Sequence, residues 1–483
     1  MRKYIFILFN TLAIRISRRC FITCAILFYA TNIYAGDIPN EHVEKPSFNK
    51  LDTDFGHFST LFYKTLLSAN HYKSITNINI LQQRANSLYD EGRIADSVGL
   101  ILRNLKTAKR NVNTKAIINI EKILLNSNEI TSAQVLYKRI NSESDPIVIS
   151  NVLFSFAKYN FNRENWANVI QTINKIINYL PPHQYNHAML IEGISFQHIK
   201  KHRKAISYYK NIPLSSPYYI NARVNMAVAN IRQDWWTDAQ IIFTHLLQLP
   251  KALNNKELSD RLYTIMGYSF LQQEYFRNSR NAFRNVQLDG PYTNKALLGI
   301  ALDSAYQKDF IGALNAARIL KNKKSTQLEV EESHLLLPYF YEKLHQYSTA
   351  SAGYTTAIKY YENRIAKFNK AKNISFSRFK KTLGYGDKKT LQLEDETVSL
   401  EKYLPTAYFT QLQLLKEYQP VVHTLNNRLL NHSFNQLMIR FAHIAYKVTQ
   451  NDLNKQSRYI TDYMNQCRYG LARMFDTGMN RTE

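Results

Sequence analysis

Residues 186–217 have the sequence NHAMLIEGISFQHIKKHRKAISYYKNIPLSSP, which combines small and aromatic residues at fixed distances. Gly193 is followed three positions later by Phe196, and Ala205 is followed four positions later by Tyr209. Small side chains let two antiparallel helices approach closely, and a large side chain four positions on fills the groove toward the next element. The stretch therefore predicts a helical hairpin.

The same spacing recurs along the chain, with intervals of 34 residues from Gly193 to Ala227 and again from Gly267 to Ala301. The small positions of the five clearest units are Gly193 and Ala205, Ala227 and Ala239, Gly267 and Ser279, Ala301 and Ala313, and Pro338 and Ala350. Weaker units precede them around Ala85, Ala133 and Trp166. One hairpin leaves a face uncovered, so neighbouring hairpins are expected to stack into an all-α solenoid.

This pattern resembles the tetratricopeptide repeat (TPR) family, whose helix–turn–helix units have small residues at these two positions. The resemblance covers residues 186–360 and implies a right-handed superhelical array followed by a C-terminal helical region. The chain departs from the family where Asn230 and Ser304 replace an aromatic residue, and where Pro338 falls within a helix. About six extra residues near 251–257 predict a longer loop between two units.

The TPR resemblance also implies a binding groove, because the first helices of such arrays line a concave face. The residues expected to contact a partner there are Arg261, Tyr268, Lys295, Tyr306, Tyr339 and Glu342. Most positions in this implied row are apolar or aromatic, which favours an extended or helical protein segment with apolar anchors. The alternative is that many of these side chains pack against the adjacent hairpin.

The N-terminus has the layout of a secretory signal peptide. Residues 1–35 contain five basic residues and no acidic one, and an apolar stretch at 21–30 precedes Ala35, after which we expect cleavage. The segment could instead be retained as an anchor, and Arg18-Arg19 also resembles a twin-arginine export motif. We therefore expect a periplasmic or otherwise exported protein.

Composition changes divide the rest of the chain. We expect an N-terminal extension at 36–79, divergent hairpins at 80–180, the TPR array at 181–362, a basic linker at 363–400 and a helical region at 401–483. Nine Lys or Arg residues and two Gly between 364 and 389 favour a mobile, solvated linker. The tail around Leu471 is similar to the first helix of another repeat, which would cap the array or await a partner's helix.

Charge suggests a second kind of function. The 483 residues include 62 Lys and Arg against 37 Asp and Glu, a formal charge of +25. Such a chain could bind anionic lipid, glycan or nucleic acid through a basic surface, although drift in composition explains the charge equally well. Of three Cys, only Cys467 lies beyond the predicted signal, which excludes an internal disulfide and a Cys-based zinc site in the mature chain.

No phosphate-binding loop, nucleophile elbow or zinc-protease motif occurs, so we predict no catalysis, cofactor or metal. His198 and His202 are four apart but are expected on either side of a turn, which disfavours a metal site. The preferred hypothesis is a non-catalytic scaffold of the cell envelope that binds other envelope proteins or peptide segments. Electrostatic binding to an anionic surface, including a peripheral membrane contact, is the alternative, and nucleic acid is disfavoured by the predicted export.

Overall fold

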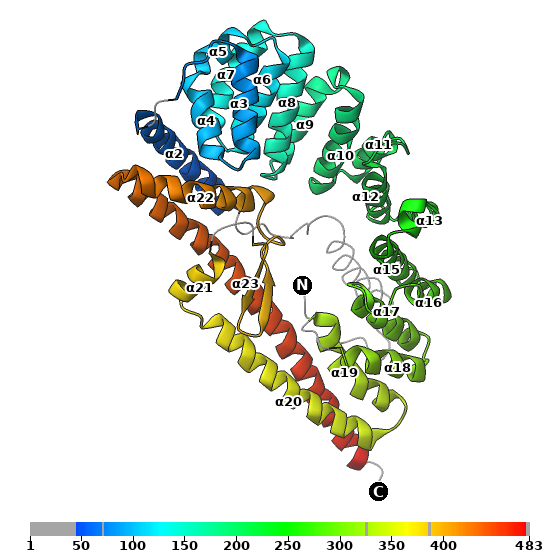
Figure 1. Ribbon diagram of the computed structural model, residues 1–483. Helices are drawn as coiled ribbons and strands as arrows, with labels where there is room; N and C mark the ends of the chain where they lie inside the picture. The colour runs from blue at the N-terminus through cyan, green and yellow to red at the C-terminus, as the bar shows by residue number, and fades with distance from the viewer. Residues whose placement is uncertain (1–44, 70–71, 324–326, 385–387, 480–483) are drawn as a thin grey trace.

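The computed structural model describes residues 45–69, 72–323, 327–384 and 388–479, almost all of them helical (Figure 1). The predicted signal segment at 1–35 lies outside these residues. The helices before the clearest repeats are α2 (Lys45–Ala69), α3 (Ile78–Asp90), α4 (Ile94–Arg103), α5 (Leu105–Arg110), α6 (Lys115–Asn126), α7 (Ile130–Glu143), α8 (Pro146–Phe161) and α9 (Trp166–Ile176), which is followed by a 3₁₀ turn at Ile177–Tyr179.

The predicted array and the region after it contain the remaining elements. The array helices are α10 (Pro182–His198), α11 (His202–Lys210), α12 (Tyr219–Ile231), α13 (Trp236–Leu247), α14 (Pro250–Leu253), α15 (Lys256–Gln272), α16 (Phe276–Arg284), α17 (Thr293–Tyr306), α18 (Phe310–Lys321) and α19 (Leu328–Lys343). They are followed by α20 (Tyr347–Lys372), α21 (Phe376–Leu383), strands β1 (Thr390–Leu393) and β2 (Glu396–Ser399), α22 (Thr406–Leu425) and α23 (Arg428–Met479).

Within the described ranges, eight hairpins share one turn geometry. In each, a residue with positive φ ends the first helix, and the next backbone N–H donates to the carbonyl five residues before it, at 2.8–3.0 Å. This is the Schellman arrangement, which satisfies a carbonyl left free at a helix end. The positive-φ residues are Gly92, Asn128, Glu164, Lys200, Asp234, Glu274, Lys308 and His345. Their spacing of 34–40 residues places the divergent N-terminal units in the same repeat as the clear ones.

The small residues lie where the helices of these hairpins meet. A Cβ at Gly193 would stand 2.4 Å from the ring of Tyr209, and one at Gly267 would stand 2.5 Å from Phe283, so neither site has room for a side chain. The small positions, all buried, are Gly193, Ala205, Ala227, Ala239, Gly267, Ala301, Ala313 and Ala350. The close approach of each pair of helices therefore depends on these residues.

The hairpins form an arc whose two ends are joined by α23. In Figure 1 the first helices of the hairpins, such as α12, α15 and α17, line the inner side of the arc, and their partners lie outside. The 52-residue α23 extends about 78 Å at 1.5 Å per residue. Its beginning packs against α2 and α22, and its later part runs antiparallel to α20 and also touches α19. One hydrophobic cluster accordingly contains residues from both ends of the array, at 48–152 and 301–474.

Aromatic residues form the N-terminal side of this closure. The ring of Phe62 on α2 stacks on Tyr418 of α22 at 4.6 Å, and Phe58 lies 5.8 Å from Phe434 of α23. The hydroxyls of Tyr63 and Tyr418 share a hydrogen bond of 2.9 Å. Helices α2, α22 and α23, which are far apart in the sequence, are thus held together by one aromatic cluster, and the two tyrosine hydroxyls buried in it are hydrogen-bonded to each other.

An ion pair and a glycine form the C-terminal side of the closure, where the end of α23 meets α19 and α20. Arg473 of α23 donates two hydrogen bonds, of 3.2 and 2.9 Å, to the carboxylate of Glu342 on α19, which also accepts from the hydroxyl of Tyr354 at 2.7 Å. A Cβ at Gly470 would lie 2.4 Å from the Tyr354 ring, so only glycine fits at this contact. Of the two predicted roles of the tail, the structure supports capping: the tail is the end of α23 and packs on the last hairpin, α19/α20, within the same chain.

The predicted basic linker at 363–400 is wrong, because the described residues of this segment, 363–384 and 388–400, are folded. Arg364 is 5% exposed and pairs with Glu331 of α19 at 2.6 Å and with Glu396 of β2 at 3.0 Å. The two strands pair antiparallel, with Leu391 opposite Val398 on the buried face. Acidic residues at 394–401 pair with Lys367, Arg378 and Lys389, so part of the positive charge of the segment is neutralised within the chain.

Candidate functional site

The aromatic residues predicted to anchor a partner belong mostly to the packing between hairpins. Tyr268 is 2% exposed, its hydroxyl donates to the carbonyl of Lys295 at 2.8 Å, and burial raises its pKa well above the usual value. Tyr339 is also buried. Both therefore support the fold rather than offering free surface. Tyr306 remains 42% exposed and stacks on Phe276, with ring centroids 6.1 Å apart.

Glu342, another predicted contact, is already bound within the chain. Its carboxylate faces Arg473 and Tyr354, so the last hairpin of the inner row is covered by α23. A partner could reach this carboxylate only by displacing the end of α23. Helix α23 of the same chain thus makes the contact with Glu342 that the sequence analysis expected from a partner protein.

The partly exposed groups of the inner row are mainly basic. Successive first helices present Arg232 at the end of α12, Arg261 on α15, Lys295 on α17 and Lys343 on α19. Burial without a compensating charge lowers the pKa of Arg232. An acidic group from outside would be attracted to such a row, because a partly desolvated cation gains more from a counterion than one in bulk water.

Acidic residues at the start of α19 reduce the positive charge of the inner row at that end. Glu329 is buried near Lys295, whose charge partly offsets the rise in the pKa of that carboxyl. Burial and the neighbouring Glu329 raise the pKa of Glu332 to about 7. The basic row is therefore strongest over α12, α15 and α17.

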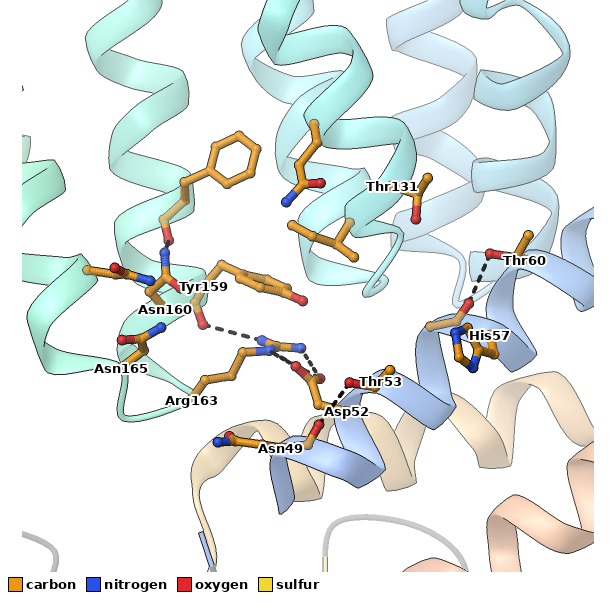
Figure 2. Close-up of a pocket in the computed structure, with 15 residues that line it drawn as sticks. Asn49, Asp52, Thr53, His57, Thr60, Thr131, Tyr159, Asn160, Arg163 and Asn165 are labelled. Carbon is orange, nitrogen blue, oxygen red and sulfur yellow. Dashed lines mark hydrogen bonds and ion pairs between the residues drawn. The ribbon is translucent and has the colours of Figure 1, made fainter. Parts of the chain in front are cut away.

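A polar pocket of about 640 Å³ lies where α2 crosses the turns of the second and third hairpins (Figure 2). Its lining combines amides, hydroxyls and one imidazole from the four helices α2, α7, α8 and α9 and from a turn. Figure 2 labels Asn49, Asp52, Thr53, His57, Thr60, Thr131, Tyr159, Asn160, Arg163 and Asn165 around it.

Arg163 is the anchor of this pocket. Its guanidinium binds both carboxylate oxygens of Asp52 on α2 at 3.0 Å, and it also donates to Asn128 and stacks on the ring of Tyr159 at 3.4 Å. Gln411 of α22 donates to the same Asp52. The pair therefore fastens α2 and α22 to the turn of the third hairpin, and its charges neutralise each other.

The remaining lining supports hydrogen bonding more than bond-making chemistry. The hydroxyls of Thr53 and Thr60 donate to backbone carbonyls one helical turn earlier, at 3.1 and 3.0 Å, so neither is oriented toward His57 as a nucleophile. In the part of the chain that the structure describes, no cluster of three His, Cys, Asp or Glu could hold a metal ion. No helix there is long and apolar enough to cross a bilayer.

Sequence reasoning missed both the pocket and its anchor. Asp52 and Arg163 are 111 residues apart, and neither lies in a recognisable motif. The only local signal was the position of Arg163 in the turn between α8 and α9, directly before the positive-φ residue Glu164.

No family model matches this chain, and no curated protein matches it. Among solved structures, the apo form of RapI is similar at 11% identity and a TM-score of 0.42, over 71% of this chain and 98% of that one. The pilF protein of Pseudomonas aeruginosa is similar at 12% identity and 0.33, over 47% and 96%. A tetratricopeptide repeat protein from Parabacteroides merdae is similar at 11% and 0.34, over 55% and 98%.

The class of protein follows from the hairpins themselves. Eight helix–turn–helix units with one turn geometry, a spacing of 34–40 residues and mostly small residues at the helix contacts give the described chain the fold of a TPR-like α-solenoid. The predicted resemblance and the predicted all-α fold class are confirmed. The closing helix α23 is what the repeat pattern alone did not predict.

Proposed function

We propose that this protein is a non-catalytic, protein-binding scaffold that holds an acidic segment of a partner along its inner row. The observation that carries the proposal is the sequence of partly exposed cations, Arg232, Arg261 and Lys295, on three successive first helices. The partner chemistry differs from the apolar anchors expected from the sequence, because two of the three predicted aromatic anchors, Tyr268 and Tyr339, are buried.

The dimensions suit an extended segment. Arg261 and Lys295 lie near the beginnings of α15 and α17, which pack together. Packed helix axes are about 10 Å apart, the length of about three extended residues. Arg232 follows the last residue of α12, at the opposite end of its helix. A short stretch rich in Asp and Glu could therefore place carboxylates at Arg261 and Lys295 and continue toward Arg232. Binding would be charge-assisted and would weaken with added salt.

The alternative is a broad electrostatic attraction to anionic lipid or glycan. The segment at 363–400 no longer supports it strongly, since several of its cations are paired within the chain. We further propose export to the cell envelope, which rests on the layout of residues 1–35. Fractionation of the host and sequencing of the mature N-terminus would test the export proposal.

A binding measurement tests the row directly. We would titrate the full chain with a fluorescent hexapeptide rich in Glu and with its Gln counterpart, and compare Arg232→Glu/Arg261→Glu with wild type. The matched control reverses two exposed charges on outer helices, Lys138→Glu/Arg277→Glu. We expect the inner-row variant alone to lose about tenfold or more in affinity, as charge-assisted contacts are lost. Equal loss in both variants would indicate diffuse attraction, and no binding to the wild type would contradict the proposal.

A further inference from the structure

Two of the eight hairpin turns differ from the others in the residue that follows the positive-φ position. This position is Arg93, Glu129, Asn165, Lys201, Trp235, Tyr275, Asp309 and Gln346 in chain order. Only Trp235 and Tyr275 are aromatic, they belong to neighbouring hairpins, and they are 38% and 60% exposed. Polar residues suit an exposed turn, so two adjacent large aromatic residues here call for an explanation.

Both aromatic residues line the same cavity, of about 340 Å³, between hairpins α12/α13 and α15/α16. This junction is the one where the turn-to-turn interval lengthens to 40 residues and where α14 is inserted between the hairpins. Trp236, Phe270 and Met266 contribute further apolar surface. The cavity is therefore built where α14 lengthens the connection between two of the clear repeats.

The charge of the cavity is opposite to that of the chain. Asp234 and Asp238 line it and are exposed, and no Lys or Arg is among its lining residues, although the chain carries a formal +25. The guanidinium of Arg203 already lies 5.5 Å from the ring centroid of Trp235. The indole is thus placed to attract cations, and the carboxylates at the rim reinforce that attraction.

We propose that this cavity binds a Lys or Arg side chain of a basic peptide segment. The aromatic walls would contact the aliphatic stem and the cation, and Asp234 and Asp238 would pair with the charged head. The site selects the opposite charge from the inner row and lies at the turns of the hairpins, where Arg232 at the end of that row is two residues before Asp234. One scaffold would then hold an acidic and a basic segment at separate places.

Intrinsic fluorescence provides the test, because two of the three tryptophans of the chain line the cavity. Trp166, the third, stacks on His198 elsewhere, so the Trp166→Phe background reports mainly on Trp235 and Trp236. We would titrate the full chain in this background with tripeptides Gly-Lys-Gly and Gly-Arg-Gly, and with Gly-citrulline-Gly as the neutral analogue. A saturable change with a cationic peptide and none with citrulline is expected, and the stronger of the two cations identifies the preferred side chain.

Variants separate recognition from fold. Asp234→Asn/Asp238→Asn should lower the affinity for the cationic peptide about tenfold, because both carboxylates that would pair with its charge are removed. Asp289→Asn, an exposed carboxylate outside the lining, is the matched control and should change nothing. Far-UV circular dichroism should be unchanged in all variants. The proposal is overturned by a missing response in the wild type, by an equal response to citrulline, or by full affinity in the Asn variant.

Discussion

At the scale of single residues, Glu121 departs from the rule that small residues occupy the helix contacts. It lies seven positions before the positive-φ residue Asn128, the position that Gly193 and Ala227 hold in their hairpins. Its side chain is fully buried, and neither carboxylate oxygen has a hydrogen-bond partner within the described residues. Burial accordingly raises its pKa well above 4.5.

This burial makes stability depend on pH. The folded state keeps the Glu121 proton to a higher pH than the unfolded state does, so the free energy of unfolding falls as pH rises above about 4.5, the ordinary value. We expect Glu121→Met to raise that free energy by about 1–3 kcal/mol at pH 7, where the buried carboxyl is costliest. Urea unfolding of both chains at pH 5 and pH 7 should show a smaller gain at pH 5. Glu121→Gln, which keeps the shape without titrating, is the control, and an equal gain at both pH values would contradict the prediction.

The sequence predicted the small residues well and the aromatic contacts poorly. Gly193 and Ala205 are recognisable because close helix approach tolerates few residue types. Tyr268 occupies a family contact position, but its ring turns edge-on to Phe283 at 4.9 Å, and spacing alone does not specify that orientation. The residue type at a repeat position therefore predicts helix packing more reliably than it predicts whether a side chain is exposed to a partner.

At the scale of elements, the close contact between α20 and α23 depends on Gly470. We expect Gly470→Leu to push the end of α23 away from Tyr354, because any Cβ there overlaps the ring. Overpacking of this kind costs about 1–3 kcal/mol. Limited proteolysis should then cut the last turns of α23 faster than in the wild type.

A matched variant on the same helix provides the control for this contact. Ala472→Leu places the same leucine side chain at an exposed position two residues away and should leave the cleavage rate unchanged. Equal protection of the wild type and Gly470→Leu would mean that the contact with Tyr354 does not hold the helix in place.

The prediction of a solvated linker at 363–400 failed because charge was counted over too short a segment. Between 364 and 389 cations dominate, and the acids that pair with them come at 394–401, after the turn of the β-hairpin. Arg364 is also buried by α19 and β2, which come from opposite sides in the sequence. Local composition indicates solvation only when no later segment can fold back onto it.

At the scale of the whole molecule, repeats predicted the arc and could not predict its closure. Stacking follows from local periodicity, whereas α2 and α23 meet across nearly the whole length of the chain and share no repeat. The two ends join one large hydrophobic cluster, while the middle hairpins have small separate cores. The closing contacts therefore hold the ends of an array whose centre is the more deformable part.

Substitutions in the ion pair of Asp52 with Arg163 can test this closure, because the pair joins α2 to the turn of the third hairpin. Arg163→Asp places two carboxylates against each other at the seam, which we expect to release α2 and to raise the radius of gyration measured by small-angle X-ray scattering. The exchange Asp52→Arg/Arg163→Asp restores opposite charges and should recover most of the compact form. Breaking a largely buried pair costs about 3–5 kcal/mol, less here because Asp52 is partly exposed. If the single variant kept the wild-type radius, the aromatic contacts of Phe62 with Tyr418 would suffice to hold the closure without the ion pair.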